Sequence, residues 1–124
     1  MAKIIIIDDE PAMVEVIVTL CREKGHQVFP FSAPSKALEQ MDTIQPQVVI
    51  TDIKMETMTG FDVLRHVREN HRQTSVILIT AFDEPGMRAR VLWEGAAAYM
   101  QKPIELDWLR RAIESALATV PGRS

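Results

Sequence analysis

The sequence predicts an α/β fold, a doubly wound sandwich in which helices cover both faces of a parallel sheet. Two observations carry this prediction. Short apolar runs recur along the 124 residues, at 4–7, 28–31, 48–51, 76–80 and 98–100, and most are continuous rather than alternating. Continuous apolar runs are typical of strands buried on both faces. The segments between the runs carry apolar residues at helical spacing, so strand and helix alternate as (βα)5 with right-handed crossovers.

The first two units indicate the order of the strands. After the run at 4–7, the first helix has Met13, Ile17 and Leu20 on one face and is closed by Gly25. The second strand contains Pro30, which has no amide proton for a neighbouring strand, so we expect this strand at a sheet edge. The order 2-1-3-4-5 satisfies this and opens a crevice beyond the carboxyl ends of strands 1 and 3.

The remaining four helices follow the second, third, fourth and fifth strands. Their core faces carry Leu38 and Met41, then Leu64 and Val67, then Met87 and Val91, and finally Leu106, Leu109, Ile113, Ala116 and Leu117. We expect the fourth helix to begin at Pro85, a favourable first-turn residue. Gly86 should weaken that turn by about 1 kcal/mol relative to Ala.

Composition excludes several classes of protein. The chain has 47% hydrophobic and 25% charged residues, ordinary values for one soluble domain. Cys21 is the lone cysteine, so disulfide frameworks are excluded within the chain, a cytoplasmic location is expected, and Cys21 is interpreted as a buried core residue. The net charge of -3, without a basic block, argues against direct nucleic-acid binding by this domain. No apolar run approaches the roughly 20 residues that span a membrane.

Acidic residues follow the first and third predicted strands. Asp8, Asp9 and Glu10 come directly after the first strand, and Asp52 follows the third apolar run. In the predicted order these strands are neighbours, so the carboxylates converge and their repulsion requires a compensating cation. Hard carboxylate oxygens with open positions suit Mg²⁺. The first three acids could instead simply favour the dipole of the following helix, but their combination with Asp52 predicts a metal site.

The fourth and fifth strands bring a hydroxyl and a cation to the same edge. Thr80 ends the fourth strand, and Lys102 follows the fifth. Beside a metal-bound carboxylate, these two groups form a pocket for a phosphoryl group. Alone, Thr80 could be an ordinary strand residue and Lys102 an ordinary loop lysine, so the prediction rests on the combination.

These residues resemble the motifs of the response-regulator receiver domains of two-component signalling, over about residues 3–118. The family's acidic pair matches Asp8 and Asp9, its phosphoacceptor Asp52, its switch hydroxyl Thr80, its aromatic switch Tyr99 and its Lys-Pro pair Lys102 and Pro103. The resemblance implies a flavodoxin-like sandwich, with a receiver domain at 1–119 and a tail or linker start at 120–124. It suggests a cis bond between Lys102 and Pro103, which sequence alone does not decide.

The resemblance also implies a chemistry. Asp52 would take a phosphoryl group from a phosphohistidine of a sensor histidine kinase or a histidine phosphotransfer protein. Asp9, Asp52 and the backbone carbonyl of Lys54 would hold Mg²⁺ directly, and Asp8 through a bound water. Lys102 would contact a phosphoryl oxygen. The domain would not be an enzyme beyond catalysing its own phosphorylation and dephosphorylation.

A switch follows by the same resemblance. Thr80 would move to bond the phosphoryl group, and Tyr99 would turn into the vacated space, which changes the surface of the fourth helix, fifth strand and fifth helix. Tyr99 could also be an ordinary core aromatic with its hydroxyl at the rim. Output or homodimerisation could use an exposed set on the last two helices. This set comprises Arg88, Leu92, Trp93, Trp108 and Arg111, whose rings could instead cover neighbouring helices.

Three further features bear on partners and kinetics. Val14 and Val18 lie off the core stripe of the first helix and form either a kinase-docking patch or a wider core stripe. Glu56 stands where the family usually has Pro. Lys54 and Phe82 flank the route of an attacking water, and we hypothesise that Phe82 slows loss of the phosphoryl group.

Other functions were weighed against these residues. A Mg²⁺-dependent phosphohydrolase on a similar fold needs the same groups, but haloacid-dehalogenase-like enzymes place two aspartates two residues apart on the first strand, whereas here they are adjacent. An interaction scaffold that no longer accepts phosphate is disfavoured because every expected residue is present. The segment 96–99 lacks the Asp pair typical of winged-helix regulators, which disfavours that class without naming another, so transcription regulation is kept only as one candidate output. The three histidines form no ligand cluster and are expected to be solvated.

Overall fold

Strands and helices alternate along the part of the chain that the computed structural model describes, residues 2–82 and 84–118. The strands are β1 (Lys3–Ile7), β2 (Gln27–Phe31), β3 (Val48–Asp52), β4 (Ser75–Thr80) and β5 (Ala98–Gln101). The helices are α1 (Pro11–Glu23), α2 (Pro34–Ile44), α3 (Gly60–Asn70), α4 (Met87–Trp93) and α5 (Leu106–Ala118). The tail predicted at 120–124 lies outside the described residues.

The strands form one parallel sheet in the order β2-β1-β3-β4-β5, which confirms the predicted order. Pro30 lies on β2, the edge strand, opposite Ile6. An edge strand needs partners on one side only, so the missing amide proton breaks no ladder in the sheet interior. The central strands β3 and β4 bury every residue, as the continuous apolar runs predicted.

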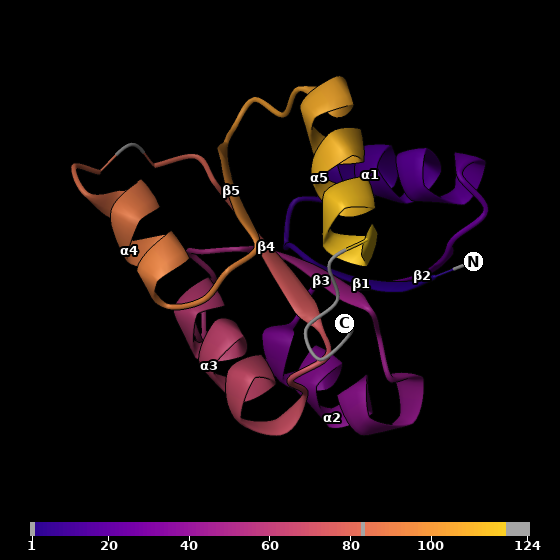
Figure 1. Cartoon of the computed structure of the whole chain (residues 1–124), viewed down its shortest axis with the longest axis horizontal. Helices are drawn as coiled ribbons and strands as arrows, with labels where there is room; N and C mark the ends of the chain where they lie inside the picture. The colour runs from indigo at the N-terminus through magenta and orange to yellow at the C-terminus, as the bar shows by residue number, and fades with distance from the viewer. Residues whose placement is uncertain (1, 83, 119–124) are drawn as a thin grey trace.

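Each face of the sheet carries its own core. Ile4 and Ile6 pack with α1 and α5 on one face, while Ile5 and Ile7 pack with α2, α3 and α4 on the other. Figure 1 shows the two helical layers, with α5 and α1 together above the sheet and α4, α3 and α2 along its left and lower sides. The chain therefore forms the predicted three-layer sandwich.

Two local expectations were wrong. The helix α4 begins at Met87, and Gly86 precedes it as the N-cap in the left-handed region with φ 79°. Gly adopts that conformation readily, so it ends the preceding loop and does not weaken a helical turn. His71 is buried rather than solvated, because it caps α3 with its amide on Val67, and its Nε2 lies 3.1 Å from Asp42 Oδ1.

The expectation for Cys21 agrees with the structure. Cys21 is buried in the core beneath α1, and burial raises its pKa to about 11. Its thiol is therefore almost entirely protonated at neutral pH and is a poor nucleophile. In the described part of the chain, no helix has both the length and the apolar character that crossing a bilayer requires.

Candidate functional site

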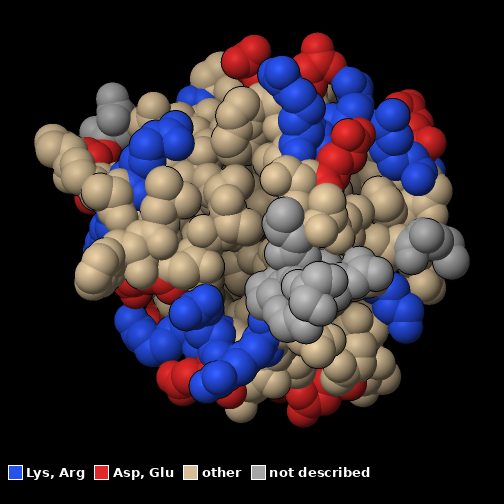
Figure 2. All heavy atoms as spheres, viewed as in Figure 1, with Lys and Arg blue, Asp and Glu red and all other residues tan. Residues whose placement is uncertain are grey.

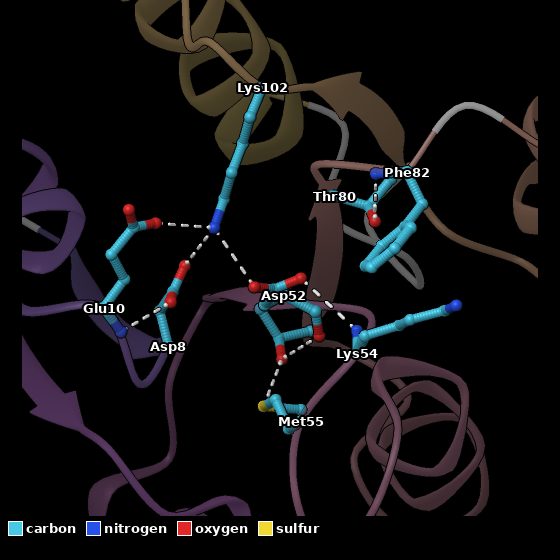
Figure 3. A network of polar contacts seen from close by, with 9 residues as sticks. Asp8, Glu10, Asp52, Lys54, Met55, Thr80, Phe82 and Lys102 are labelled. Atoms are coloured by element: carbon cyan, nitrogen blue, oxygen red, sulfur yellow. Dashed lines mark hydrogen bonds and ion pairs between the residues drawn. The ribbon is translucent and has the colours of Figure 1, made fainter.

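Four of the predicted site residues come from four different strands and meet at one edge of the sheet (Figure 3). Asp8 follows β1, Asp52 ends β3, Thr80 ends β4, and Lys102 follows β5. All strands run parallel, so their carboxyl ends lie at the same edge, and the neighbouring strands β1 and β3 bring their acids side by side. The polar groups therefore gather at the predicted edge of the sheet.

Three carboxylates lie together there. One oxygen from each of Asp8, Asp9 and Asp52 lies within 4.8 Å of the others. Asp8 and Asp52 are buried, whereas Asp9 is exposed. Burial raises the pKa of Asp8, although the amide of Glu10 and the charge of Lys102 act in the opposite direction. Such hard oxygen donors, with one open side towards solvent, fit a divalent cation that retains water ligands.

Lys102 joins these acids through its ammonium group. Its Nζ lies 3.2 Å from Asp8 Oδ2, 3.1 Å from Asp52 Oδ2 and 3.1 Å from Glu10 Oε1. Burial alone would lower the pKa of Lys102, but the hydrogen bonds to Glu10 and Asp52 and the charge of Asp8 raise it. The lysine is therefore firmly charged and offsets part of the carboxylate repulsion.

The backbone around Lys102 ties β5 to the site. Its N–H donates to the carbonyl of Thr80, the last residue of β4, at 2.7 Å, which extends the pairing of the two strands by one residue beyond the end of β5. The bond between Lys102 and Pro103 is cis, as the resemblance suggested. Glu10 was counted among the converging acids but was not assigned to the site, and its bond to Lys102 depends on the turn between β1 and α1.

The loop after Asp52 is held close to the acceptor strand. The amide of Lys54 donates to Asp52 Oδ1 at 3.3 Å. The helix α3 then begins with a capping box in which Thr59 and Asp62 bond each other's backbone amides. A Cβ on Gly60 would lie 2.5 Å from the carbonyl oxygen of Asp52, so only glycine lets α3 start this close to the strand.

The two residues assigned to a switch are both inside the protein. Thr80 is fully buried, and its Oγ1 accepts a hydrogen bond from the amide of Phe82 at 3.1 Å. Tyr99 is 4% exposed and packs in the core on the α3 and α4 side, with the Arg88 guanidinium 5.3 Å from its ring centroid. The geometry agrees with the core interpretation of Tyr99, which is compatible with a switching role.

A contact between two loops covers the Asp52 side of the site. The Nζ of Lys54 lies 3.8 Å from the ring centroid of Phe82 and 3.4 Å from Glu84 Oε1. Lys54 belongs to the loop after β3, whereas Phe82 and Glu84 belong to the loop after β4. The sequence placed Lys54 and Phe82 near the site, but their direct contact is a finding of the structure.

The predicted surface patches are only partly as expected. Val14 and Val18 are half-buried and pack against the core, which favours the wider core stripe. The exposed apolar residue on α1 is Val16, at 43%, which sequence reasoning missed. On the last two helices, Trp93 is 89% exposed, whereas Trp108 is half-buried against the core.

Comparisons with known proteins cover most of the chain. A family model described as response regulator receiver domain matches residues 4–114. The transcriptional regulatory protein TrcR of Mycobacterium tuberculosis is 31% identical over 107 residues, which are 86% of this chain and 42% of that protein. The regulatory protein AtoC of Escherichia coli is 33% identical over 115 residues, which are 93% of this chain and 25% of that protein.

Solved structures show the same fold. A response regulator receiver domain protein of Clostridium thermocellum has a TM-score of 0.88 and 31% identity, with 95% of each chain covered. The chain spans between a quarter and about half of the length of the first curated relatives that it matches.

Proposed function

Because the chain belongs to the response regulator receiver domain family, we propose that it is a phosphoacceptor module of two-component signalling in which Asp52 receives the phosphoryl group. One observation carries this proposal: the ammonium of Lys102 lies 3.1 Å from Asp52 and 3.2 Å from Asp8, at the edge where Thr80 also ends its strand. A cation, a hydroxyl and a pair of acids around one carboxylate form a pocket for phosphoryl transfer.

The donor is a phosphohistidine of a sensor histidine kinase or of a histidine phosphotransfer protein. A carboxylate oxygen of Asp52 attacks the phosphorus, the phosphorus–nitrogen bond breaks, and the histidine keeps the electron pair of that bond. Lys102 holds a developing negative oxygen through its ammonium, and the amide of Lys54, 3.3 Å from Asp52 Oδ1, orients the attacking carboxylate. The domain is thus not an enzyme for an external small substrate.

Mg²⁺ is the cofactor that the donor set fits best. Asp8, Asp9, Asp52 and the backbone carbonyl of Lys54 are the proposed ligands, all oxygen donors of the kind that Mg²⁺ prefers. When bound, the cation supplies positive charge against the oxygens of the transferring phosphoryl group. The side chain of Lys102, held by Glu10 as well as by the aspartates, remains available as the second positive group.

Phosphorylation is then transmitted by Thr80 and Tyr99. The hydroxyl of Thr80 leaves the amide of Phe82 and bonds a phosphoryl oxygen, which frees space inside the core. Tyr99, which packs against α3 and α4, turns towards that space. The surface of α4, β5 and α5 changes as a result, and it serves as an output or homodimer surface.

Kinase docking is assigned to a groove of about 490 Å³ between α1 and α5. Val16 and Leu106, each 43% exposed, line it together with the buried Leu20. Its polar lining residues are Glu15, Thr19, Glu23 and Arg110. Apolar anchors with a polar border suit the helix of a phosphotransfer domain. Replacing Val16 by Asp should slow phosphorylation by the kinase while leaving phosphorylation by acetyl phosphate unchanged.

The acceptor assignment is tested with acetyl phosphate and Mg²⁺, or with a beryllofluoride mimic, followed by intact mass or NMR. Wild-type protein should be modified, and Asp52→Asn should not. Equal modification of both proteins would exclude Asp52 as acceptor. Multiple turnover of p-nitrophenyl phosphate would favour the phosphohydrolase alternative.

The unit that carries this function is proposed to extend over residues 1–119 and to act in the cytoplasm. Relatives named as transcriptional regulatory proteins support transcription control as the output of the whole protein. A reporter gene tests that output: its expression should depend on Asp52 when the full-length regulator is supplied.

A further inference from the structure

A groove lies at the opposite end of the sheet from Asp52. It has a volume of about 1060 Å³ and runs between the end of α3, the first residues of β4 and β5, and α5. The strands begin here and end at the phosphoacceptor edge, so the groove is separated from that edge by the length of the sheet. The groove is therefore not part of the site described above.

Three arginines line this groove: Arg68, Arg72 and Arg111. All three are exposed, and none forms an ion pair or a side-chain hydrogen bond within residues 2–82 and 84–118. Glu69 is the one acidic residue among the described residues that line it. By contrast, Arg65, Arg90 and Arg110 all lie within 4 Å of a carboxylate. Unpaired guanidinium groups gathered in one place favour a negatively charged ligand.

Gly95 holds one of these arginines against the groove wall. A Cβ at this residue would lie 2.7 Å from the guanidinium carbon of Arg68, so the guanidinium packs on the backbone of the turn before β5. The φ of Gly95 is +101°, a conformation that other residues rarely adopt. The turn before β5 therefore packs against the guanidinium of Arg68 at the wall of the groove.

The floor of the groove is apolar in part, and the buried polar residues His71, Thr74 and Ser75 also line the groove. Trp108, Ala112 and Ala116 contribute one side from α5, and Leu64 and Val76 contribute the other. Figure 2 shows basic side chains, with some acidic ones beside them, gathered over α3 at the lower left and bordering an uncharged area. A ligand that fits both features carries negative charges at its borders and an apolar side chain between them.

We propose that this groove docks an acidic segment of a partner protein, with an apolar anchor residue seated beside Trp108. A second copy of the chain does not fit in a symmetric dimer, because the three arginines would face their own copies. Among residues 119–124 the charged side chain is Arg123, which has the same sign as the groove. The positive charge of the three arginines thus favours an acidic segment of another protein over any part of this chain.

The proposal is tested with a fluorescein-labelled peptide, Asp-Glu-Asp-Leu-Phe-Glu-Asp-Leu-Asp-Glu, by fluorescence anisotropy on the 124-residue protein. We expect saturable binding that weakens about tenfold or more in a double variant, Arg72→Glu and Arg111→Glu. The matched control, Arg22→Glu and Lys24→Glu, changes the net charge equally on exposed residues outside the groove. It should bind the peptide as wild type does, and Asp52→Asn should as well.

A second measurement, the fluorescence emission of Trp108, tests whether the peptide contacts the apolar part of the groove lining. In a Trp93→Phe variant, Trp108 is the remaining tryptophan, and its emission should shift when unlabelled peptide binds. The proposal is overturned if the peptide does not bind, if its Asn and Gln analogue binds equally, or if both double variants lose affinity equally. Unchanged Trp108 emission, or tighter binding of an oligouridylate than of the peptide, would also overturn it.

Discussion

The two ends of the sheet differ in how their charges are neutralised. At the carboxyl end, one lysine, Lys102, contacts three acids and is nearly buried. At the amino end, three arginines line an open groove without an acidic partner among the described residues. At the carboxyl end the charges neutralise one another inside the protein. Removing one partner therefore leaves a buried charge unpaired, which destabilises the fold. The second end can lose a charge with little internal consequence, which is how a docking surface behaves.

The largest expected effect breaks the pairing at the carboxyl end. Replacing Lys102 by Met leaves Asp8 and Asp52 buried without their cation, so the free energy of unfolding should fall by about 3 kcal/mol at neutral pH. Urea unfolding measures this. Lys54→Met, which removes an exposed lysine paired with Glu84, should cost less than about 1 kcal/mol. Equal losses would contradict the contrast between buried and exposed pairing.

Substitutions at two glycines, one at each end of the sheet, also compare the two ends. Gly60→Ala should lower the free energy of unfolding by about 3 kcal/mol, because the added Cβ meets the backbone carbonyl of Asp52. Gly95→Ala should cost about 1 to 2 kcal/mol, since its Cβ meets the movable end of Arg68 and the left-handed backbone adds strain. Thermal unfolding of both variants measures the difference. If Gly95→Ala costs more, the groove wall is the more rigid region.

The acid cluster also predicts a pH dependence. The pKa of Asp8 is raised in the folded protein, so without metal the folded state binds more protons than the unfolded state above the usual pKa of Asp. Stability from this group is therefore greatest at low pH and falls as pH rises through the raised pKa. Asp8→Asn should remove that fall and raise stability at neutral pH. It should also weaken stabilisation by added Mg²⁺, and an unchanged Mg²⁺ effect would argue against Asp8 as a ligand.

The smallest expected effect concerns the cover over Asp52. Phe82 contacts Lys54. If it shields the route of an attacking water, as we hypothesise, Phe82→Ala should shorten the lifetime of the phosphorylated protein severalfold, on the order of 1 kcal/mol in the barrier. Phosphate release after removal of acetyl phosphate measures the lifetime. Leu92→Ala is the matched control, because both side chains are 45% exposed. A lifetime that Phe82→Ala leaves unchanged would remove the shielding role.

Several features were predictable because they depend on local pattern. The apolar runs predicted each strand, and Pro30 predicted which strand lies at an edge, since a missing amide proton is a property of the residue itself. The acids after strands 1 and 3 predicted where a polar site would form. Once parallel strands are neighbours, their carboxyl ends must meet, so Asp8 and Asp52 had to approach each other.

Other features required the three-dimensional arrangement of loops. The bond from Lys102 to Glu10 joins residues 92 apart in sequence, and the contact of Lys54 with Phe82 joins two separate loops. Their distances depend on backbone turns that no periodicity describes. His71 is buried, and its Nε2 lies 3.1 Å from Asp42 Oδ1 on α2, a contact between two helices that the periodicity of either helix does not predict.

The sequence by itself determined the layers, the strand order and the set of groups at the carboxyl edge, because these follow from periodicity and from residue chemistry. The tertiary structure decided which of these groups touch and which cations remain unpaired. Lys102 and the groove arginines are all basic residues in the sequence, yet Lys102 lies among acids while the arginines face solvent. Charge pairing depends on distances of a few ångströms between distant segments, and those distances are set by the packing of helices and loops on the sheet.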